Sequence, residues 1–467
     1  MTRKLVIVGG GPGGYVAAIR AAQLGAKVSL IEAGRLGGTC LNRGCIPTKA
    51  LYENARVLNT IKQSEVFGIN VKGYDVDIKR MNERKQQIVE GLVSGIDRLL
   101  RANGVEVING TGTFADKETI VVVEHSGKRY EVKGENILIA TGSLPSVLPI
   151  PGTDLQGVVT SARLLETAKI PSSMVVIGGG VVGTEFAGIY NAFGTDVTVM
   201  EYMPRILPDM DHDIGKRLTP ALKRKGIRVH TGVEVKGIFR DEEGLIVKAE
   251  GQKGEIAVKA EKVLVSTGRR MNAEGLNLDA AGIDYDEKGI KVNENFATNI
   301  PGIYAIGDVI EGPMLAHVAS DEGKAAVENM LGLKGHINYD AVPSCVFSFP
   351  EVAAVGLTEQ QAKERGIPYL TGKFMFNANG KALTMEAGEG FIKAVAAKET
   401  KEIIGVHMMG PHASDLIHEA ALAVTNKLTI SQIARTLHTH PTLSEAFLEA
   451  VLGLENRAIH AAPNFRK

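Results

Sequence analysis

The chain lacks features that several classes of protein require. Three cysteines in 467 residues are too few for the disulfide framework of a small secreted domain. Lysine plus arginine and aspartate plus glutamate both number 53, so no excess charge indicates a nucleic-acid or anionic-membrane partner. No run approaches about 18 continuous apolar residues, and the 17 prolines mark no long linker. We therefore expect a soluble, cytoplasmic protein with no nucleic-acid or membrane partner.

The length of the chain and its first residues indicate several folded domains, the first of which begins with a strand. A chain of 467 residues is too long for one hydrophobic core, and about three domains are expected. Arg3 and Lys4 precede an apolar run at residues 5–8, which resembles the start of a signal peptide. The run stops at Gly9, so a short buried strand is the better interpretation.

Two of the three cysteines lie five positions apart, within residues 37–49. Such positions in a regular helix are roughly 8–9 Å apart, whereas a disulfide needs its Cα atoms within roughly 4.4–6.8 Å. A bond between Cys40 and Cys45 would require a break in the helix, which Gly44 permits. Pro47 suits the first turn of a helix that starts near Cys45, where a thiolate is stabilised. The pattern favours a redox-active disulfide.

Two other interpretations of the cysteine pair remain open from the residues alone. The cysteines could be buried free thiols, or they could form half of a zinc site. Zinc needs a second pair of ligands, and neither Cys345 nor a nearby histidine supplies an obvious one. No metal is therefore expected.

The first residues carry a complete dinucleotide-binding pattern. A strand at residues 4–8 leads into Gly9, Gly11 and Gly14, spaced as G-x-G-x-x-G, then a helix through residue 24 and a strand at 27–31 that Glu32 closes. The glycines let backbone N–H groups approach a pyrophosphate, and the acid can bind a pair of ribose hydroxyls. The prediction of a dinucleotide-binding unit is specific because the strand, loop, helix, second strand and acid occur together in this order.

The same unit recurs in the middle of the chain. Gly178, Gly180 and Gly183 follow a strand at residues 174–177, and Glu201 follows the strand at 196–200. The acid follows the first glycine at the same spacing in both copies. Two intact patterns predict two bound dinucleotides; the alternative is a second copy that has lost binding.

Each half also has a later strand that ends in a small turn, Thr141-Gly142 in the first and Thr267-Gly268 in the second. The first half is longer between its acid and this turn, and the cysteine element accounts for much of the difference. The cysteines are therefore an insertion close to the first cofactor.

A long helix is predicted over residues 78–100, with apolar residues at 78, 81, 88, 92, 96 and 99. It is expected to pack on the first domain, with dimerisation as an alternative.

Two later features carry polar groups that could act on a ligand. Asp308 ends a short strand, where a carboxylate suits a ribityl hydroxyl or caps the next helix. His440 precedes a proline, so it lies at a turn, and Glu445 is close enough in sequence to reach a ring nitrogen. That pair could be a base with its orienting carboxylate, or only a turn with a capping residue.

In this order, these features resemble the flavin-dependent pyridine nucleotide–disulfide oxidoreductases nearly end to end. The likeness is closest to the members that oxidise dihydrolipoyl groups, through residues 37–49, 199–208 and 440–445. The resemblance implies an α/β fold with two Rossmann-like dinucleotide-binding domains and an α+β C-terminal interface domain, in an obligate homodimer. It implies an FAD-binding domain at residues 1–149, an NAD-binding domain at 150–272, a central segment at 273–340 that completes the FAD domain, and the interface domain at 341–467.

The resemblance also implies roles for individual residues. His440, oriented by Glu445, would take a thiol proton across the dimer interface, while Cys40 meets the substrate and Cys45 meets the flavin. The residues implied in FAD binding are Gly9, Gly11, Gly14, Glu32, Lys49, Gly112, Thr141, Gly142, Asp308 and Ala316, with Lys49 paired to Glu185 beside the flavin ring. Those implied in NAD binding are Gly178, Gly180, Gly183, Glu201, Val235 and Gly268.

The activity implied is oxidation of dihydrolipoyl groups of a 2-oxoacid dehydrogenase or glycine cleavage complex, with electrons passing through Cys40 and Cys45 and FAD to NAD⁺. The partner would be a lipoylated acyltransferase core or a lipoyl-carrier protein. NAD is expected rather than NADP because Glu201 would repel a 2′-phosphate. Reduction of another small disulfide, and a redox-silent nucleotide-binding role in a complex, remain alternatives. Met271 and Val318 stand where the family usually has proline and lysine, which leaves a specialised paralogue open.

Overall fold

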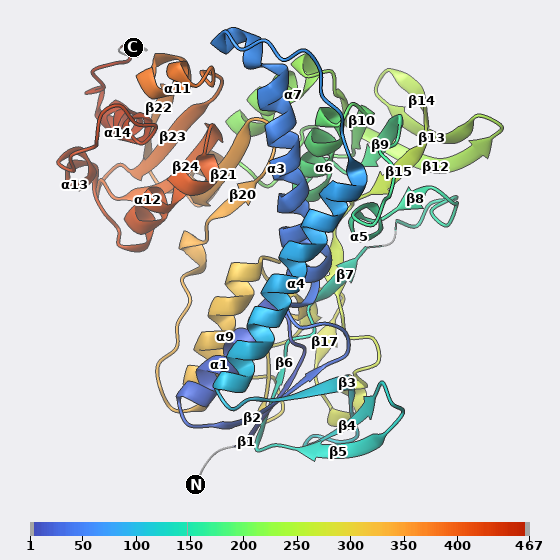
Figure 1. Ribbon diagram of the computed structural model, residues 1–467. Coiled ribbons are helices and arrows are strands. Elements are labelled where there is room, and N and C mark those ends of the chain that lie inside the picture. The colour runs from blue at the N-terminus through green and yellow to red at the C-terminus, as the bar shows by residue number, and fades with distance from the viewer. Residues whose placement is uncertain (1–3, 147, 463–467) are drawn as a thin grey trace.

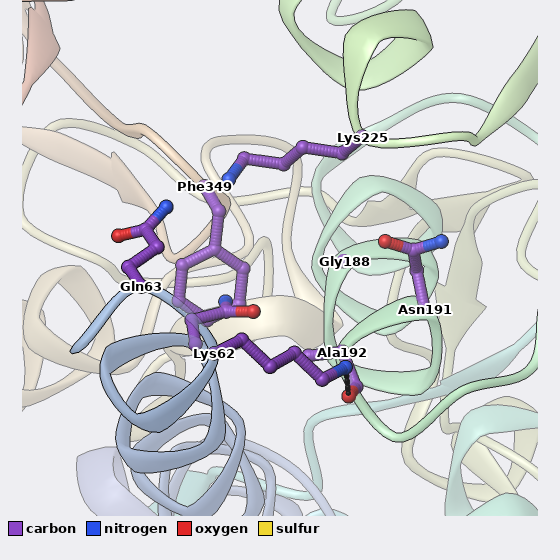
Figure 2. Close-up of a pocket in the computed structure, with 8 residues that line it drawn as sticks. Lys62, Gln63, Gly188, Asn191, Ala192, Lys225 and Phe349 are labelled. Atoms are coloured by element: carbon purple, nitrogen blue, oxygen red, sulfur yellow. Dashed lines mark hydrogen bonds between the residues drawn. The ribbon is translucent and has the colours of Figure 1, made fainter. Parts of the chain in front are cut away.

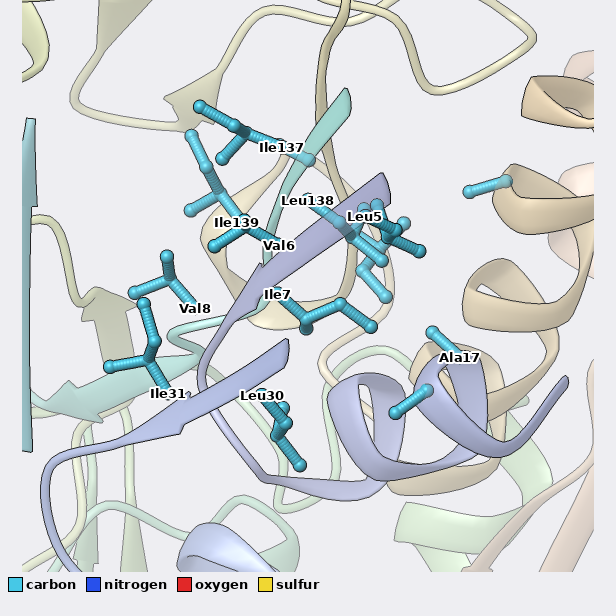
Figure 3. Packing of buried hydrophobic residues seen from close by; sticks show 14 of the residues in the cluster. Leu5, Val6, Ile7, Val8, Ala17, Leu30, Ile31, Ile137, Leu138 and Ile139 are labelled. Carbon is cyan, nitrogen blue, oxygen red and sulfur yellow. The ribbon is translucent and has the colours of Figure 1, made fainter. Parts of the chain in front are cut away.

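The first nucleotide-type unit is built around β1 (Lys4–Val8) in the computed structural model, which describes residues 4–146 and 148–462 (Figure 1). β1 pairs in parallel with β2 (Lys27–Glu32) on one side and β6 (Asn136–Ile139) on the other. These strands are nearly continuous runs of buried Val, Ile and Leu, as expected for a parallel sheet covered on both faces. Figure 3 shows their side chains packed together with Ala17 of α1 (Pro12–Gln23).

Strands from distant parts of the chain complete this first sheet. Its order is β19-β6-β1-β2-β3-β4-β5, with β3 (Glu106–Phe114), β4 (Thr119–Glu124), β5 (Arg129–Lys133) and β19 (Ile303–Ala305). β19 follows the second unit in sequence, so the chain returns to the first sheet. α9 (Ala316–Met330) then packs on α1 so closely that a Cβ on Gly323 would lie 2.6 Å from the carbonyl oxygen of Gly13. This return brings Asp308 and Ala316 to the first unit.

Helices are inserted between β2 and β3. α2 (Gly38–Arg43) and α3 (Cys45–Lys62) are separated by Gly44 alone, and η1 (Ser64–Phe67) leads on to α4 (Ile78–Ala102). α4 begins after Asp77, whose side chain accepts the N–H of Arg80 and so caps the helix. Figure 1 shows α3 and α4 running side by side between the first sheet and the C-terminal unit.

The long amphipathic helix predicted over residues 78–100 is confirmed as α4, but two residues of its apolar stripe are exposed. Leu92 and Leu99 are 43% and 53% exposed, whereas the helix buries Val89, Ile96 and Leu100. Lys85 is buried too, and its ammonium donates to the carbonyl oxygen of Leu165. A lysine stem can pack like an apolar side chain, so the buried face includes a residue that hydropathy assigns to solvent.

The second unit repeats the first. β9 (Ser173–Ile177), α6 (Val181–Ala192) and β10 (Asp196–Glu201) follow one another, and β9 and β10 pair in parallel. The sheet order is β11-β10-β9-β15-β8, with β8 (Val158–Val159), β11 (Arg228–Thr231) and β15 (Lys262–Val265). α5 (Ser161–Leu164) precedes β9, and α7 (His212–Arg224) lies between β10 and β11 in the chain.

Smaller elements connect the units. An antiparallel sheet of β12 (Val233–Asp241), β13 (Gly244–Gly251) and β14 (Gly254–Ala260) is inserted before β15. β7 (Ser143–Pro145) pairs with β16 (Arg269–Met271) where the chain leaves and re-enters the first unit. The returning segment also forms α8 (Leu278–Ala281), β17 (Tyr285–Asp286), β18 (Gly289–Ile290) and η2 (Gly307–Val309).

The C-terminal unit is an antiparallel sheet with helices packed on it. The strand order is β20-β21-β24-β23-β22, with β20 (Ser344–Val346), β21 (Glu351–Gly356), β22 (Tyr369–Met375), β23 (Phe391–Ala397) and β24 (Ile403–Gly410). The helices are α10 (Glu359–Glu364), α11 (Gly380–Thr384), α12 (Ala413–Thr425), α13 (Ile430–Ala434) and α14 (Glu445–Leu452), with short η3 (Tyr339–Ala341), η4 (Phe376–Ala378) and η5 (Gly453–Glu455). α12 and α14 share one buried core with the sheet.

A buried ionic cluster fastens this C-terminal sheet to the second unit. Lys393 of β23 is 2% exposed and lies 2.9 Å from Asp211, 3.1 Å from Asp213 and 2.6 Å from Glu359. Lys373 of β22 adds a second cation 2.7 Å from Asp213. Asp211 and Asp213 lie at the start of α7, so the cluster joins elements of both units. Leaving one charge of a buried pair without its partner typically costs about 3–5 kcal/mol. The ion pairs of Lys393 with Asp211 and Asp213 therefore hold the two units in one orientation.

The predicted fold class is confirmed: two Rossmann-like units and an α+β C-terminal unit in an α/β protein. The boundaries after residues 149, 272 and 340 stay predictions. Among the residues that the structure describes, every helix is too short or too polar to cross a bilayer.

Candidate active site

Cys40 and Cys45 lie at the break between two helices. Cys40 is inside α2, and Cys45 is the first residue of α3. Gly44 makes the break, because a Cβ at this position would lie 2.9 Å from the carbonyl oxygen of Thr39. The predicted break and the predicted helix start are therefore confirmed. Both cysteines are free thiols, so the structure describes the dithiol form of the pair, and the disulfide itself stays a prediction.

The two thiols differ in acid strength. A hydrogen bond with the Cys40 thiol, helped by the nearby Lys49 ammonium, outweighs burial and lowers the pKa of Cys45 from 9.0 to about 7. The same hydrogen bond, together with burial and the charge on Cys45, raises the pKa of Cys40. The N-terminus of α3 adds a further preference for a thiolate on Cys45. The pair therefore carries its negative charge on Cys45 and its proton on Cys40.

The predicted partners Lys49 and Glu185 are brought together from α3 and α6. The Lys49 ammonium lies 2.9 and 2.8 Å from the two carboxylate oxygens of Glu185, whose side chain is 5% exposed. The backbone N–H of Phe347 donates to the same carboxylate at 3.0 Å, and the ammonium lies 4.6 Å from the centre of the Phe347 ring. One turn of α3 thus carries both Cys45 and the cation that stabilises its thiolate.

The first glycine loop forms a backbone cradle at the carboxyl end of β1. A side chain on Gly14 would collide with the carbonyl oxygen of Gly9, so this position lets α1 pack against the strand. At Gly11, by contrast, the nearest atom to such a side chain would be 3.9 Å away, which leaves room for a phosphate at the start of α1. Glu32 accepts two backbone N–H groups of the loops at 2.6 and 2.7 Å and so faces the cradle.

The second glycine loop has the same construction. A side chain on Gly183 would collide with the carbonyl oxygen of Gly178, whereas nothing lies within 4 Å of one on Gly180. Glu201 accepts two backbone N–H groups at 2.5 and 2.6 Å. Both cradles are tight at the outer glycines, open at the middle one and flanked by an acid, which fits one dinucleotide each.

The remaining residues predicted to bind FAD gather along the same edge of the first sheet. Gly112 lies on β3 past the residues that pair with β2, where a Cβ would be 3.4 Å from side-chain atoms of both Val8 and Ile31. Thr141 and Gly142 follow β6, and the Thr141 hydroxyl donates to Asn272 at 2.7 Å. Other predicted residues follow the returning strand, with Asp308 in η2 and Ala316 at the start of α9.

His440 and Glu445 form a hydrogen-bonded pair in the C-terminal unit. His440 Nδ1 lies 2.9 Å from one oxygen of Glu445, and the other oxygen accepts the Thr442 N–H at 2.8 Å. Burial raises the pKa of Glu445, but the Thr442 N–H and the imidazole outweigh it and keep the carboxylate charged. The ring is 78% exposed, and its Nε2 has no hydrogen-bond partner among the described residues. Among residues 4–146 and 148–462, no hydrogen bond or ion pair joins His440 to Cys40 or Cys45.

Comparison with known protein families agrees with this set of features. The model for pyridine nucleotide-disulphide oxidoreductases matches residues 3–323. The chain belongs to this family. A second model, for the dimerisation domain of pyridine nucleotide-disulphide oxidoreductases, matches residues 342–451.

Individual relatives of this oxidoreductase family match nearly the whole chain. The chain is 43% identical over 467 residues to a dihydrolipoyl dehydrogenase of Bacillus subtilis (strain 168), covering 98% of each protein. It is 44% identical to a mitochondrial dihydrolipoyl dehydrogenase of Pisum sativum, covering 98% of this chain and 92% of that protein. A solved structure, LpdA from Mycobacterium tuberculosis, superposes with a TM-score of 0.90 at 28% identity, covering 97% of this chain and 99% of LpdA.

As a pyridine nucleotide-disulphide oxidoreductase, the chain is an FAD-dependent enzyme. The predicted cofactors, FAD and NAD, are confirmed. The match to the family's dimerisation domain supports the predicted homodimer. The roles of individual residues in binding these cofactors stay predictions, and both glycine cradles fit them.

Two of the residues predicted for NAD binding in this oxidoreductase lie away from the glycine loop itself. Gly268 follows β15 with a positive φ of 119°, a conformation that favours glycine. Val235 lies on β12 beside a hydrophobic cluster that includes Met200, near the end of β10. Phe347, which the sequence analysis missed, holds the Lys49–Glu185 pair through both its N–H and its ring. No local pattern marks it, because its partners are far away in the sequence.

The residues that depart from the family pattern lie in apolar surroundings. Met271 packs partly against the first core, and Val318 is 2% exposed on α9. Cys345 of β20 is half-buried, and burial raises its pKa to about 11. Cys345 therefore stays a protonated thiol and lacks the low pKa of a reactive cysteine.

A pocket of about 230 Å³ lies where the C-terminal ends of α3 and α6 meet (Figure 2). Figure 2 shows Lys225 extending over Phe349 and Lys62 reaching the end of α6. Lys62 donates to the carbonyl oxygen of Ala192 at 2.6 Å, and burial lowers the pKa of Lys225. Cys45 and Glu185 lie near the opposite, N-terminal ends of the same helices, so this pocket is separate from the cysteine pair.

Proposed function

We propose that this chain is an FAD-dependent dihydrolipoyl dehydrogenase, which oxidises dihydrolipoyl groups with NAD⁺. The observation that carries the proposal is its 43–44% identity, over 98% of the chain, to two proteins that bear this name. The site supports it: a cysteine pair with its charge on Cys45, two dinucleotide cradles, and a histidine held by a carboxylate.

The chemistry starts at His440, which Glu445 orients so that Nε2 is free to accept a proton. His440 takes the proton of one substrate thiol, and the resulting thiolate bonds to Cys40 of the oxidised pair. The bond between the cysteines breaks, and Cys45, which has the lower pKa, leaves as the thiolate. The second substrate thiol gives up its proton to solvent and its sulfur bonds to the first, while Cys40 leaves with the electron pair of its bond to the substrate and takes the proton held by His440. The cysteine pair is then in its reduced form.

FAD, when bound, would supply the two-electron chemistry that links the reduced cysteine pair to NAD⁺. The residues proposed to hold it are those of the first cradle and sheet edge, and those proposed to hold NAD are in the second cradle. Glu201 favours NAD over NADP, because its carboxylate would repel a 2′-phosphate. The ion pair with Glu185 holds the ammonium of Lys49 in place near Cys45, where it favours the thiolate.

The dimer is part of the proposal, because His440 of one subunit would serve the cysteine pair of the other. Within the described chain, no hydrogen bond or ion pair links His440 to the cysteines, and its ring is open to the surface. The physiological partner would be a lipoylated acyltransferase core or a lipoyl-carrier protein, in the cytoplasm. If the protein were instead a reductase of another small disulfide, it would turn over that disulfide faster than lipoamide.

The test is turnover of dihydrolipoamide with NAD⁺ by the purified protein with its flavin. Activity with dihydrolipoamide is expected, together with the yellow colour and spectrum of bound FAD. Flavin without thiol turnover would favour the redox-silent alternative. Faster turnover of another disulfide would favour the alternative reductase.

The role of His440 is tested separately by two assays on one variant. His440→Gln should lose about 10²–10⁴-fold in dihydrolipoamide turnover, whereas reduction of a dye by NADH should stay near wild type. Glu445→Gln should lose less, because it orients the ring without accepting the proton. Equal loss in both assays would mean that His440 is structural. Hybrid dimers of His440→Gln with Cys45→Ser should recover activity if the base acts across the interface.

A further inference from the structure

A second histidine–glutamate pair takes its carboxylate from the same helix as Glu445. Glu449 is one turn after Glu445 on α14, and its Oε1 lies 3.0 Å from Nδ1 of His460. Its Oε2 accepts the backbone N–H groups of Ile459 and His460, both at 3.0 Å. The carboxylate is 8% exposed, whereas the His460 ring is 71% exposed. A buried acid therefore holds an exposed imidazole in a defined orientation.

The two pairs are built in the same way. In each, one carboxylate oxygen holds the ring Nδ1 and the other accepts backbone N–H. In each, Nε2 has no hydrogen-bond partner within the described residues. Residues four apart on a helix have Cβ atoms about 5–6 Å apart, so Glu445 and Glu449 share one face of α14. His460 is also near enough to Glu445 to help lower the pKa of that carboxyl group, together with Thr442 and His440, whereas burial raises it.

Anchoring the end of the chain accounts for only part of this arrangement. The two backbone N–H groups already fix the segment to Glu449, and they need no imidazole. The additional bond to Nδ1 has a specific effect on the ring: it directs the free Nε2 outward, as a proton acceptor requires.

Oxidation of a dithiol removes two thiol protons. Both S–H bonds must break before the two sulfurs join, and a single imidazole holds only one of these protons. We propose that His460, oriented by Glu449, is a second proton acceptor at the dithiol site. This inference rests on the proposed function.

The protons and electrons then balance as follows. His440 takes the first thiol proton, the substrate sulfur bonds to Cys40, and the electron pair of the broken disulfide goes to Cys45. His460 takes the second thiol proton, the second sulfur bonds to the first, and Cys40 leaves with the electron pair of its bond to the substrate. His440 returns its proton to Cys40. His460, whose ring is open to water, gives its proton to solvent, and this is the one proton that the overall reaction with NAD⁺ releases.

The test uses the holoenzyme and the variant His460→Ala, with imidazole in the buffer as the probe. The variant should lose dihydrolipoamide turnover, by less than the about 10²–10⁴-fold of a lone base, and added imidazole should restore it in proportion to concentration. Reduction of a dye by NADH should be unchanged. His418→Ala is the matched control, because His418 is an exposed histidine of α12 with no carboxylate partner among the described residues. It should behave as wild type with and without imidazole.

A second variant separates proton transfer from anchoring. His460→Asn can keep a hydrogen bond to Glu449 from the position of Nδ1, but it has no group that accepts a proton. It should fold with an unchanged melting temperature and still lose dithiol turnover. Wild-type turnover in either His460 variant would overturn the proposal, as would a loss in His460→Ala that imidazole does not restore. If wild type itself does not oxidise dihydrolipoamide, the proposed function fails first, so the two failures are distinguishable.

Discussion

Replacing Lys49 with methionine should raise the pKa of Cys45 from about 7 toward the ordinary thiol value. Lys49 lies one turn after Cys45 on α3, and its ammonium favours the charged thiolate. Two unit charges about 6 Å apart, at an effective dielectric constant of about 20, interact by about 3 kcal/mol. Solvent reaches the Lys49 side chain, which is 31% exposed, so we expect about half of this energy, or about one pKa unit.

Glu185→Gln is the matched variant, and its effect should have the opposite sign. The carboxylate of Glu185 raises the pKa of Cys45, because a negative charge disfavours the thiolate. Removing it also frees the Lys49 ammonium, so the pKa of Cys45 should fall. The double variant should lie between the two single variants. The assay is the pH dependence of alkylation of the reduced enzyme by iodoacetamide, followed at Cys45 by peptide mass spectrometry.

The same thiol makes the stability of the reduced enzyme depend on pH. The folded pKa of Cys45 is below its ordinary value of 9.0, so its contribution to stability is complete above about pH 9 and is lost as the pH falls through about 7. The free energy of unfolding should therefore rise between pH 7 and 9, and rise less in Lys49→Met. A Cys45 pKa that does not move in Lys49→Met, or that rises in Glu185→Gln, would refute the electrostatic reasoning.

Three further outcomes are expected. Cys40→Ser should still show a thiolate–flavin charge-transfer band after two-electron reduction and Cys45→Ser should not, and the reverse pattern would exchange the two roles. Gly180→Ala should fold normally and raise KM for NADH, since only the ligand fills the space there, whereas Gly183→Ala should lower the melting temperature because its Cβ meets backbone. Glu201→Ala should narrow the preference for NADH over NADPH in kcat/KM; a wild type that already prefers NADPH contradicts the assignment.

The nucleotide units could be predicted from sequence because their signals are local. A strand, a glycine loop, a helix and an acid follow one another within a few turns, and β1, α1 and β2 fall where the pattern places them. The break at Gly44 was also predicted from a local signal: a disulfide between Cys40 and Cys45 would require an interrupted helix, and glycine permits the interruption.

The long-range contacts around the candidate site could not be predicted from the sequence. Phe347 donates to Glu185 only because the C-terminal unit packs against α6, and no spacing in the chain records that contact. Apolar periodicity did not predict the full buried face of α4, because this face includes the stem of Lys85, a residue type that is usually exposed to solvent. The pairing of His460 with Glu449 depends on how the segment after α14 turns back, which a single sequence does not specify.

The ionic cluster around Lys393 limits how this enzyme can move during turnover. Swinging the C-terminal unit away from the second nucleotide unit would expose Lys393 and separate it from two carboxylates, those of Asp211 and Asp213. Enzymes that close domains over a substrate use hinges and interfaces that open at low cost. We therefore expect the unit with His440 and the second nucleotide unit to move as one rigid body. Under the proposed function, the ligands would have to move instead: the lipoyl group of the substrate and the nicotinamide ring of NAD.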